Sequence, residues 1–255
     1  MPKVERKRPT AGELIEVLNR SSLPTVLVEG NDDVIVFRRL EDYFIDLGIS
    51  VLPVGGRECV LEIFQRRKEI KHPKTLVFIA DRDVWSISGI PAEYDSTQLI
   101  FTRGYSIEND IYIDGNFESL LFGGEQNNLN SEIDIFSKWY SLAVYRFLNG
   151  KHNKLDTHPD SIFSDPLLKQ GIQSLEAGET FPTDLFERIK KDYKLLIRGK
   201  SLFGLLMRQL SYKGRAVRHR HDSLIEQVAV NRGDLLSEIF ERVGTLFKPA
   251  QHESA

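Results

Sequence analysis

The stretch VLVEGNDD, residues 26–33, decides the fold predicted for this chain. Its apolar run stops abruptly at Glu29 and Gly30, and acidic residues follow where a helix is expected to begin. A second apolar run, TLVFIA at residues 75–80, ends in DRD at residues 81–83. Near-continuous apolar runs of this length are typical of strands covered on both faces in a parallel sheet.

The acidic residues that end these two strands predict a metal site. In parallel sheets the ligand site lies outside the carboxyl ends of the strands, so Glu29, Asp81 and Asp83 are expected to converge on one edge. Alternation along a strand would point both aspartates the same way. Asp33 lies one helical turn beyond Glu29 and could reach the same ion. Crowded carboxylates are costly without a cation, and Mg²⁺ or Mn²⁺ takes such oxygen ligands.

Strands and helices alternate through the first half of the chain. Apolar patterns predict strands at residues 26–28, 49–54, 75–80 and 98–102, and helices over residues 34–47 and around Val60 to Phe64. This order predicts an α/β fold, a Rossmann-like parallel sheet flanked by helices. Asn31 or Asp32 is expected to cap the helix after the first strand, and a weak strand over residues 111–113 could extend the edge.

The second half reads as a helical elaboration. Helices are expected around residues 133–147, 185–196, 202–210, 224–230 and 234–247, and residues 151–182 read as an irregular connection. The predicted organisation is an arm and helix at residues 1–20, an α/β domain at 21–115 and a helical region at 116–255. A capping box at Thr10 and Glu13 is expected to start the first helix.

Composition and charge limit the possible classes of protein. With 255 residues, 41% apolar and 28% charged, the chain resembles ordinary soluble proteins, and no run approaches the about 18 apolar residues of a membrane span. The start, MPKVERKRP, lacks the apolar segment of a signal peptide. The single cysteine, Cys59, cannot form an intramolecular disulfide. A cytoplasmic, reducing location is therefore expected, with no membrane partner.

Basic residues concentrate in one segment of a chain whose net charge is −3. Residues 190–221 hold ten Lys and Arg residues and one acidic residue, Asp192. A basic segment on an acidic body is a plausible phosphate-contacting surface. The residues expected to contact nucleic acid are Arg198, Arg208, Lys213, Arg215, Arg218 and Arg220.

Two further motifs complete a resemblance to a known family. A strand ending in Glu-Gly, followed by a strand ending in Asp-x-Asp, resembles the TOPRIM domain of topoisomerases, primases and some nucleases. Ile107-Glu108-Asn109 is similar to the Ile-Glu-Asn segment of OLD-like TOPRIM proteins, and Gly199-Lys200 to their downstream Gly-Lys. The resemblance covers roughly residues 20 to 115 well. Together these residues look most like those of the small TOPRIM effectors of anti-phage defence.

The resemblance implies a Mg²⁺-dependent nuclease. Glu29 would act as general acid/base or primary metal ligand, Asp81 and Asp83 would hold the metal, and Asp33 and Glu108 would complete one or two ion sites. Lys200 would counter charge on the scissile phosphate, although by sequence alone it is one more lysine in a basic segment. Taken alone, Glu108 could equally belong to a helix cap or turn.

The family also implies partners and a substrate. A toxic effector of this kind would cleave host tRNA, self-associate when active, and be held inactive by a separate ABC/SMC-like ATPase. No phosphate-binding loop occurs in this chain, which is compatible with a separate ATPase. The alternatives are OLD-like DNA nicking and a catalytically silent binding module. A haloacid-dehalogenase-type phosphatase also opens on Asp-x-Asp, but Trp85 stands where that motif normally has Thr or Val.

Overall fold

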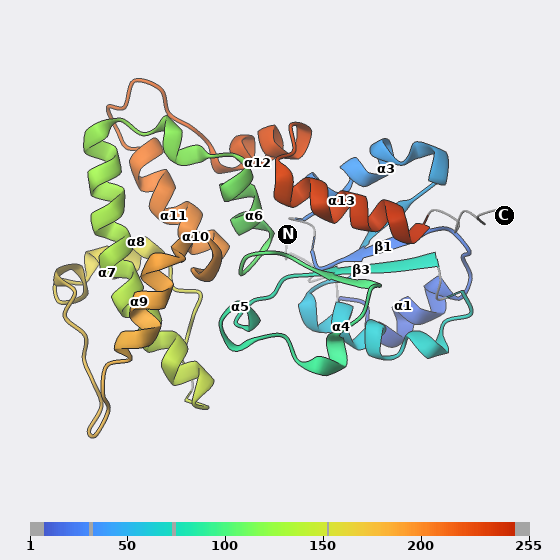
Figure 1. Cartoon of the computed structure of the whole chain (residues 1–255), viewed down its shortest axis with the longest axis horizontal. Coiled ribbons are helices and arrows are strands. Elements are labelled where there is room, and N and C mark those ends of the chain that lie inside the picture. The colour runs from blue at the N-terminus through green and yellow to red at the C-terminus, as the bar shows by residue number, and fades with distance from the viewer. Residues whose placement is uncertain (1–7, 31–32, 73–74, 152, 248–255) are drawn as a thin grey trace, which may run out of the picture. The chain divides into compact units, whose positions relative to one another are not determined.

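The computed structural model describes residues 8–30, 33–72, 75–151 and 153–247 (Figure 1). The helix cap predicted at Asn31 or Asp32 lies outside these residues. The contacts divide the chain into two compact units. The sheet unit comprises the described parts of residues 1–81, 90–102 and 229–255, and the helical unit comprises those of 82–89 and 103–228. The chain therefore crosses between units several times, whereas the sequence predicted boundaries near residues 20 and 115.

The sheet unit contains four parallel strands in the order β2-β1-β3-β4. They are β1 (Thr25–Val28), β2 (Ser50–Pro53), β3 (Leu76–Ala80) and β4 (Leu99–Phe101). In register, Val26 pairs with Val51 on one side and with Val77 on the other. Every residue of β1 and β3 is buried, as the continuous apolar runs predicted. The predicted α/β fold with a parallel sheet is confirmed.

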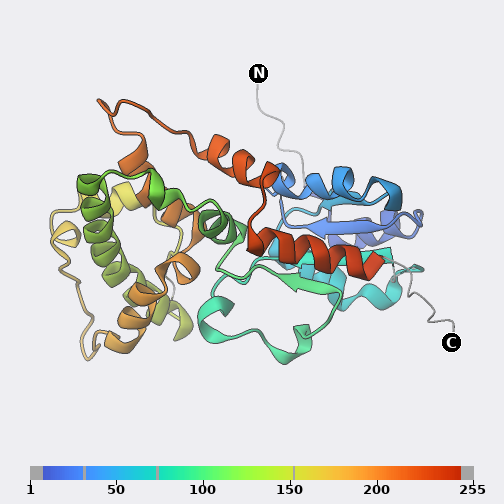
Figure 2. The ribbon, with the colours of Figure 1, turned by 45° about the horizontal axis from the view of Figure 1, so that its top comes forward.

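Helices cover both faces of this sheet (Figure 1). Two of them, α1 (Ala11–Leu18) and α4 (Arg57–Gln65), pack together on one face. The capping box predicted at Thr10 and Glu13 starts α1. The other face carries α3 (Arg39–Tyr43) and α13 (Asp234–Phe247), and α13 runs alongside the strands (Figure 2).

The last helix belongs to the sheet unit because of close packing against α3. A Cβ added at Gly244 would lie 2.6 Å from the ring of Phe44. The Tyr43 ring meets the Phe240 ring edge to face at 6.0 Å, and the Arg232 guanidinium lies over both rings. Helix α13 therefore completes the apolar cover of the sheet.

Several short elements connect the strands of the sheet unit. The helix predicted over residues 34–47 is divided into α2 (Val34–Phe37), α3 and η1 (Ile45–Leu47), where η marks a 3₁₀ helix. It ends, as predicted, at Gly48, whose φ of 60° is left-handed. The remaining two are η2 (Arg67–Glu69) and η4 (Ala92–Tyr94).

The helical unit is built around the 26-residue helix α7 (Gly123–Leu148), against which α9 (Thr183–Lys191) and α11 (Gly199–Leu210) pack. Its other elements are α5 (Trp85–Ser88), α6 (Ile107–Asp114), η5 (Phe117–Leu120), α8 (Pro159–Ser164), η6 (Leu168–Gln170), α10 (Tyr193–Leu196) and α12 (His221–Val230). None of the helices in the described ranges has the length and apolar character that a membrane crossing requires.

Two predictions about local structure were wrong. The weak strand expected over residues 111–113 is part of α6, because capping at the helix start outweighs the β-branched residues that suggested a strand. Strand alternation also does not extend to Asp83, since β3 ends at Ala80 and Asp83 has a φ of 50°. The irregular connection predicted over residues 151–182 contains only short helices, α8 and η6.

Candidate functional site

Glu29 and Asp81 meet at the carboxyl ends of neighbouring strands of the sheet unit. An Oε1 atom of Glu29 accepts a hydrogen bond from the backbone nitrogen of Asp81 at 2.7 Å. The side chain of Arg57, at the start of α4, donates from Nε to the backbone oxygen of Asp81 at 2.8 Å. Three strand-to-helix turns therefore contribute a charged residue to one edge.

This edge is the topological switch point of the sheet. From β1 the chain continues to β2 on one side and later to β3 on the other side. In parallel α/β sheets, ligands bind outside the carboxyl ends of the strands at such a switch point. Glu29 follows β1, and Asp81 follows β3. The sequence predicted both positions, but it gave no indication of Arg57.

The chemistry of these groups fits a hard cation. Carboxylate oxygens from Glu29 and Asp81 are the ligands that Mg²⁺ and Mn²⁺ take in proteins. Within the described residues, however, no three His, Cys, Asp or Glu side chains are grouped so that they could hold a metal ion. The structure therefore brings together a part of the predicted ligand set.

Asp33 shapes the turn after β1. Its Oδ2 atom accepts a hydrogen bond from the backbone nitrogen of Gly30 at 2.7 Å. This bond fixes the chain where it leaves the strand, one residue beyond Glu29. Asp33 was predicted as a metal ligand, and in the structure one of its oxygens binds the Gly30 amide.

Asp83 belongs to the helical unit, since the contact division falls between Asp81 and Arg82. Its backbone nitrogen donates to the oxygen of Tyr105 at 2.7 Å. Burial, followed by the neighbouring Tyr105, raises the pKa of the Tyr140 hydroxyl well above its usual value, and the Asp83 carboxylate contributes in the same direction. The Asp83 side chain therefore lies close to a buried tyrosine.

Glu108 lies in the first turn of α6, beside the segment that carries Lys200. A Cβ added at Gly199 would lie 2.3 Å from Oγ of Ser106 and 2.8 Å from Cβ of Glu108. Only glycine allows this approach. Lys200 follows directly and is exposed. The structure thus brings together Ile-Glu-Asn and Gly-Lys, the two further motifs of the family resemblance.

Asn109 of the first motif binds the segment that leads into the second motif. Its Nδ2 atom donates to the backbone oxygens of Lys194 at 2.7 Å and Ile197 at 2.8 Å. Its Oδ1 atom accepts from the backbone nitrogen of Ser106 at 3.0 Å. Asn109 is completely buried, so these bonds are made away from water.

Asp110 is a buried acid to which the sequence assigned no role. Its carboxylate accepts hydrogen bonds from the backbone nitrogens of Arg103 and Gly104, both at 2.8 Å. Burial raises the pKa of Asp110 to about 6 in spite of these bonds and of the nearby Arg82. The carboxylate holds the turn that leads from β4 to α6.

The basic segment divides into residues that stabilise the helical unit and residues on its surface. Arg208 forms a bidentate ion pair with Glu132, at 2.9 and 3.0 Å, and a further pair with Asp160. Arg215 is buried and binds Glu125 at 2.9 Å. Arg198 is half-buried, whereas Lys213, Arg218 and Arg220 are exposed.

These ion pairs involve two residues of the predicted nucleic-acid interface, whose contacts with nucleic acid stay a prediction. The guanidinium groups of Arg208 and Arg215 are bound to carboxylates, so their charge is already neutralised within the fold. The exposed positions Lys213, Arg218 and Arg220 remain candidates for phosphate contact. The sequence missed the pairing because Glu132 and Glu125 are distant from these arginines along the chain.

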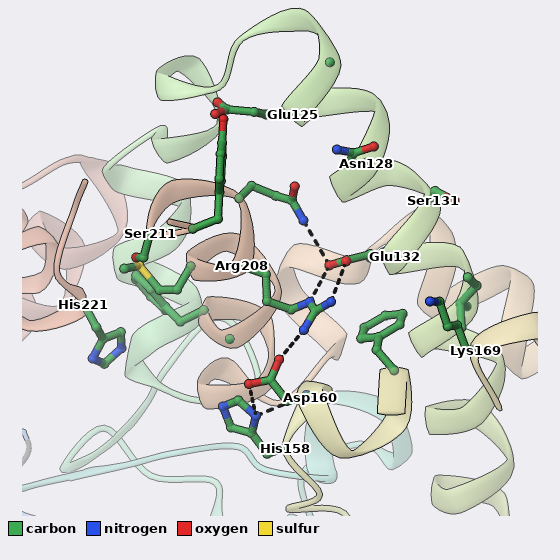
Figure 3. Close-up of a pocket in the computed structure, with 18 of the residues that line it drawn as sticks. Glu125, Asn128, Ser131, Glu132, His158, Asp160, Lys169, Arg208, Ser211 and His221 are labelled. Carbon is green, nitrogen blue, oxygen red and sulfur yellow. Dashed lines mark hydrogen bonds and ion pairs between the residues drawn. The ribbon is translucent and has the colours of Figure 1, made fainter. Parts of the chain in front are cut away.

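A pocket of about 1400 Å³ opens in the helical unit between α7, α8 and α11 (Figure 3). Arg208 crosses it, with Glu132 on one side and Asp160 on the other, and His158 lies against Asp160. Lys200 also lines this pocket. The sequence did not predict it.

No protein-family model matches the chain, and no curated protein sequence matches it.

Proposed function

We propose that this chain is a metal-dependent nuclease with a TOPRIM fold. The observation that supports this proposal is the meeting of Glu29 and Asp81 at the switch point of a parallel sheet. A Glu at the end of one strand and an Asp at the end of the neighbouring strand are the Glu and the first Asp of the TOPRIM signature. The same edge is where α/β sheets bind phosphate-bearing ligands.

Three residues of the sheet unit would take part in metal binding and catalysis. Glu29 and Asp81 would hold a Mg²⁺ or Mn²⁺ ion, which when bound supplies a Lewis acid for the phosphate oxygens and for the attacking water. Glu29 would also act as the general acid/base, which accepts a proton from that water. Arg57 would hold the Asp81 backbone at this edge through its hydrogen bond to the Asp81 backbone oxygen.

The expected roles of Asp33, Asp83, Glu108 and Lys200 stay predictions, which variants at each position test in the same assay. Lys200 would counter the negative charge that develops on the scissile phosphate. Its neighbour Gly199 is held against the first turn of α6, which restricts where the lysine can reach.

The proposed biological role is that of a toxic effector in anti-phage defence, similar to the AriB effector of the PARIS system. The substrate would be host tRNA, and a separate AriA-like ABC/SMC ATPase would hold the protein inactive until infection. Self-association would accompany activity. These statements depend on the motif resemblance.

Cleavage of tRNA and of plasmid DNA by the purified protein, with Mg²⁺ and with EDTA, tests the proposal. Glu29→Gln keeps an oxygen for the Asp81 amide but removes the charge, and it should lower the rate by at least about 100-fold. Glu93→Gln, at an exposed site of the same unit, is the matched control.

The products decide between the alternatives. Discrete tRNA fragments that disappear in the Glu29 variant would support the proposed ribonuclease. Nicked or linearised plasmid would favour an OLD-like DNA nuclease with the same metal edge. Intact nucleic acid, even after co-expression with the ATPase and a phage trigger, would favour a binding module without catalysis.

A further inference from the structure

Two exposed aromatic side chains stand among the residues that line the large pocket of the helical unit. Phe122 precedes α7 and is 70% exposed, and Tyr212 follows α11 and is 48% exposed. Both line the pocket, together with Lys200. Exposed apolar surface gathered at a pocket marks a candidate binding site.

The two rings rest on one buried ion pair. The Arg215 guanidinium lies 5.5 Å from the centre of the Phe122 ring. The same guanidinium binds both carboxylate oxygens of Glu125 and is the main cause that holds the pKa of Glu125 below its usual value; a hydrogen bond from Tyr212 contributes in the same direction. The Glu125–Arg215 pair therefore supports both rings in defined positions.

The segment that carries Tyr212 also carries positive charge. Lys213, Arg218 and Arg220 follow it and are all exposed. Inside the pocket, the charge of Arg208 is neutralised by Glu132 and Asp160, and Lys169 and Lys200 also line the pocket. Aromatic rings at the pocket edge beside exposed cations are the combination that binds single-stranded nucleic acid, by base stacking and phosphate attraction.

We propose that Phe122 and Tyr212 form a stacking platform for unpaired bases of a single-stranded nucleic acid at this pocket. This inference rests on the proposed function, because that function makes nucleic acid the expected ligand. It adds to that function a substrate-binding site outside the sheet unit. It also implies that the substrate is held through an unpaired region.

Binding of a fluorescein-labelled oligouridylate to the full-length protein, measured by fluorescence anisotropy in EDTA, tests the platform without cleavage. Phe122→Ala and Tyr212→Ala should each weaken binding by about tenfold, since one stacked base is lost. Tyr212→Phe keeps the ring and should bind within about twofold of the wild type. Phe122→Trp should bind at least as tightly as the wild type.

The matched control is Phe147→Ala on α7. Phe147 is exposed in the same unit but does not line the pocket, so this variant should bind as the wild type does. A second probe is an abasic strand of equal length, which offers phosphates but no bases. Stacking predicts that it binds more weakly and that the two alanine variants do not change its affinity. Circular dichroism verifies that each variant is folded.

The outcomes separate the platform from the nuclease. Ring-dependent binding would support the platform, and tRNA and plasmid that stay intact even after co-expression with the ATPase and a phage trigger would at the same time contradict the nuclease. The protein could instead cleave nucleic acid while its Phe122 and Tyr212 variants bind both probes like the wild type. This result would overturn the platform and would indicate that a protein partner covers the rings. No binding of either probe at low salt would also overturn it.

Discussion

Gly199 lies so close to Ser106 that a Cβ at position 199 would be 2.3 Å from the serine hydroxyl oxygen. The contact joins the start of α11 to the start of α6. Because real side chains do not approach so closely, Gly199→Ala must displace one of these segments. Asn109 holds both from the buried side, so the displacement should fall on the exposed residue that follows, Lys200.

We therefore expect Gly199→Ala to lower the proposed nuclease activity by about 10- to 100-fold, because misplacing a group by about 1 Å can cost this much. The measurement is the cleavage rate at saturating substrate. Gly123→Ala is the control, since nothing lies within 4 Å of a Cβ at that position, and its rate should equal the wild type. Equal rates for both variants would show that Lys200 needs no fixed position.

Arg215 should stabilise the fold instead of contacting a ligand through its charge. It is 8% exposed and is bound to Glu125, so its removal leaves a carboxylate without its partner in a largely buried place. Arg215→Ala is expected to lower the free energy of unfolding by about 3 kcal/mol. Urea denaturation measures this change.

Arg218→Ala is the matched control for that experiment, because Arg218 is exposed on the same segment. Exposed substitutions usually change stability by less than about 0.5 kcal/mol. If Arg215→Ala were as stable as Arg218→Ala, the buried pair would be replaceable by water and the interpretation would be wrong.

Asp110 should make the stability of the protein depend on pH in an unusual direction. Burial raises its pKa from the ordinary value of 3.8 to about 6 in the fold, so the folded state binds the proton more tightly than the unfolded state. Stability from this group is therefore present below pH 3.8 and is lost as the pH rises through about 6. The change amounts to about 3 kcal/mol.

The comparison of wild type with Asp110→Asn isolates this effect. Urea unfolding at several pH values between 4 and 7 should show the wild type losing stability relative to the variant as the pH rises. Acids with a lowered pKa make stability rise with pH; one example is Glu179, whose pKa the pairing with Arg146 lowers to about 2. Their contributions are the same in both proteins and cancel in the difference. Asp95→Asn, at an exposed site, controls for the loss of one carboxylate.

The sequence predicted the sheet well because its signals are local. An apolar run such as residues 75–80 predicts a buried strand. The acidic residues at its end mark the edge of the sheet where the carboxyl ends of the strands lie. Asp83 was misjudged because alternation holds only while the strand continues, and a left-handed residue ends it. The strand order, which makes the Glu29–Asp81 edge a switch point, depends on pairing between distant segments.

The ion-pair partners of the basic residues could not be predicted from the sequence for the same reason. The sequence shows how many basic residues lie in 190–221. Whether each guanidinium is available to a ligand depends on the side chains that lie next to it in space. Arg208 and Arg215 meet acids of α7, which no local pattern reveals. The Asn109 bonds to Lys194 and Ile197 likewise join segments far apart in the chain.

The exposed cations should therefore carry the salt dependence of nucleic-acid binding. Each phosphate contact releases counterions, so the affinity of the wild type should fall as salt rises, with a slope that counts the contacts. Lys213→Ala, Arg218→Ala and Arg220→Ala should each reduce this slope by about 1. Lys154→Ala, which removes an exposed cation outside the basic segment, should leave it unchanged. An affinity that is flat between low and moderate salt would exclude phosphate contact by this segment, whatever the nucleic acid.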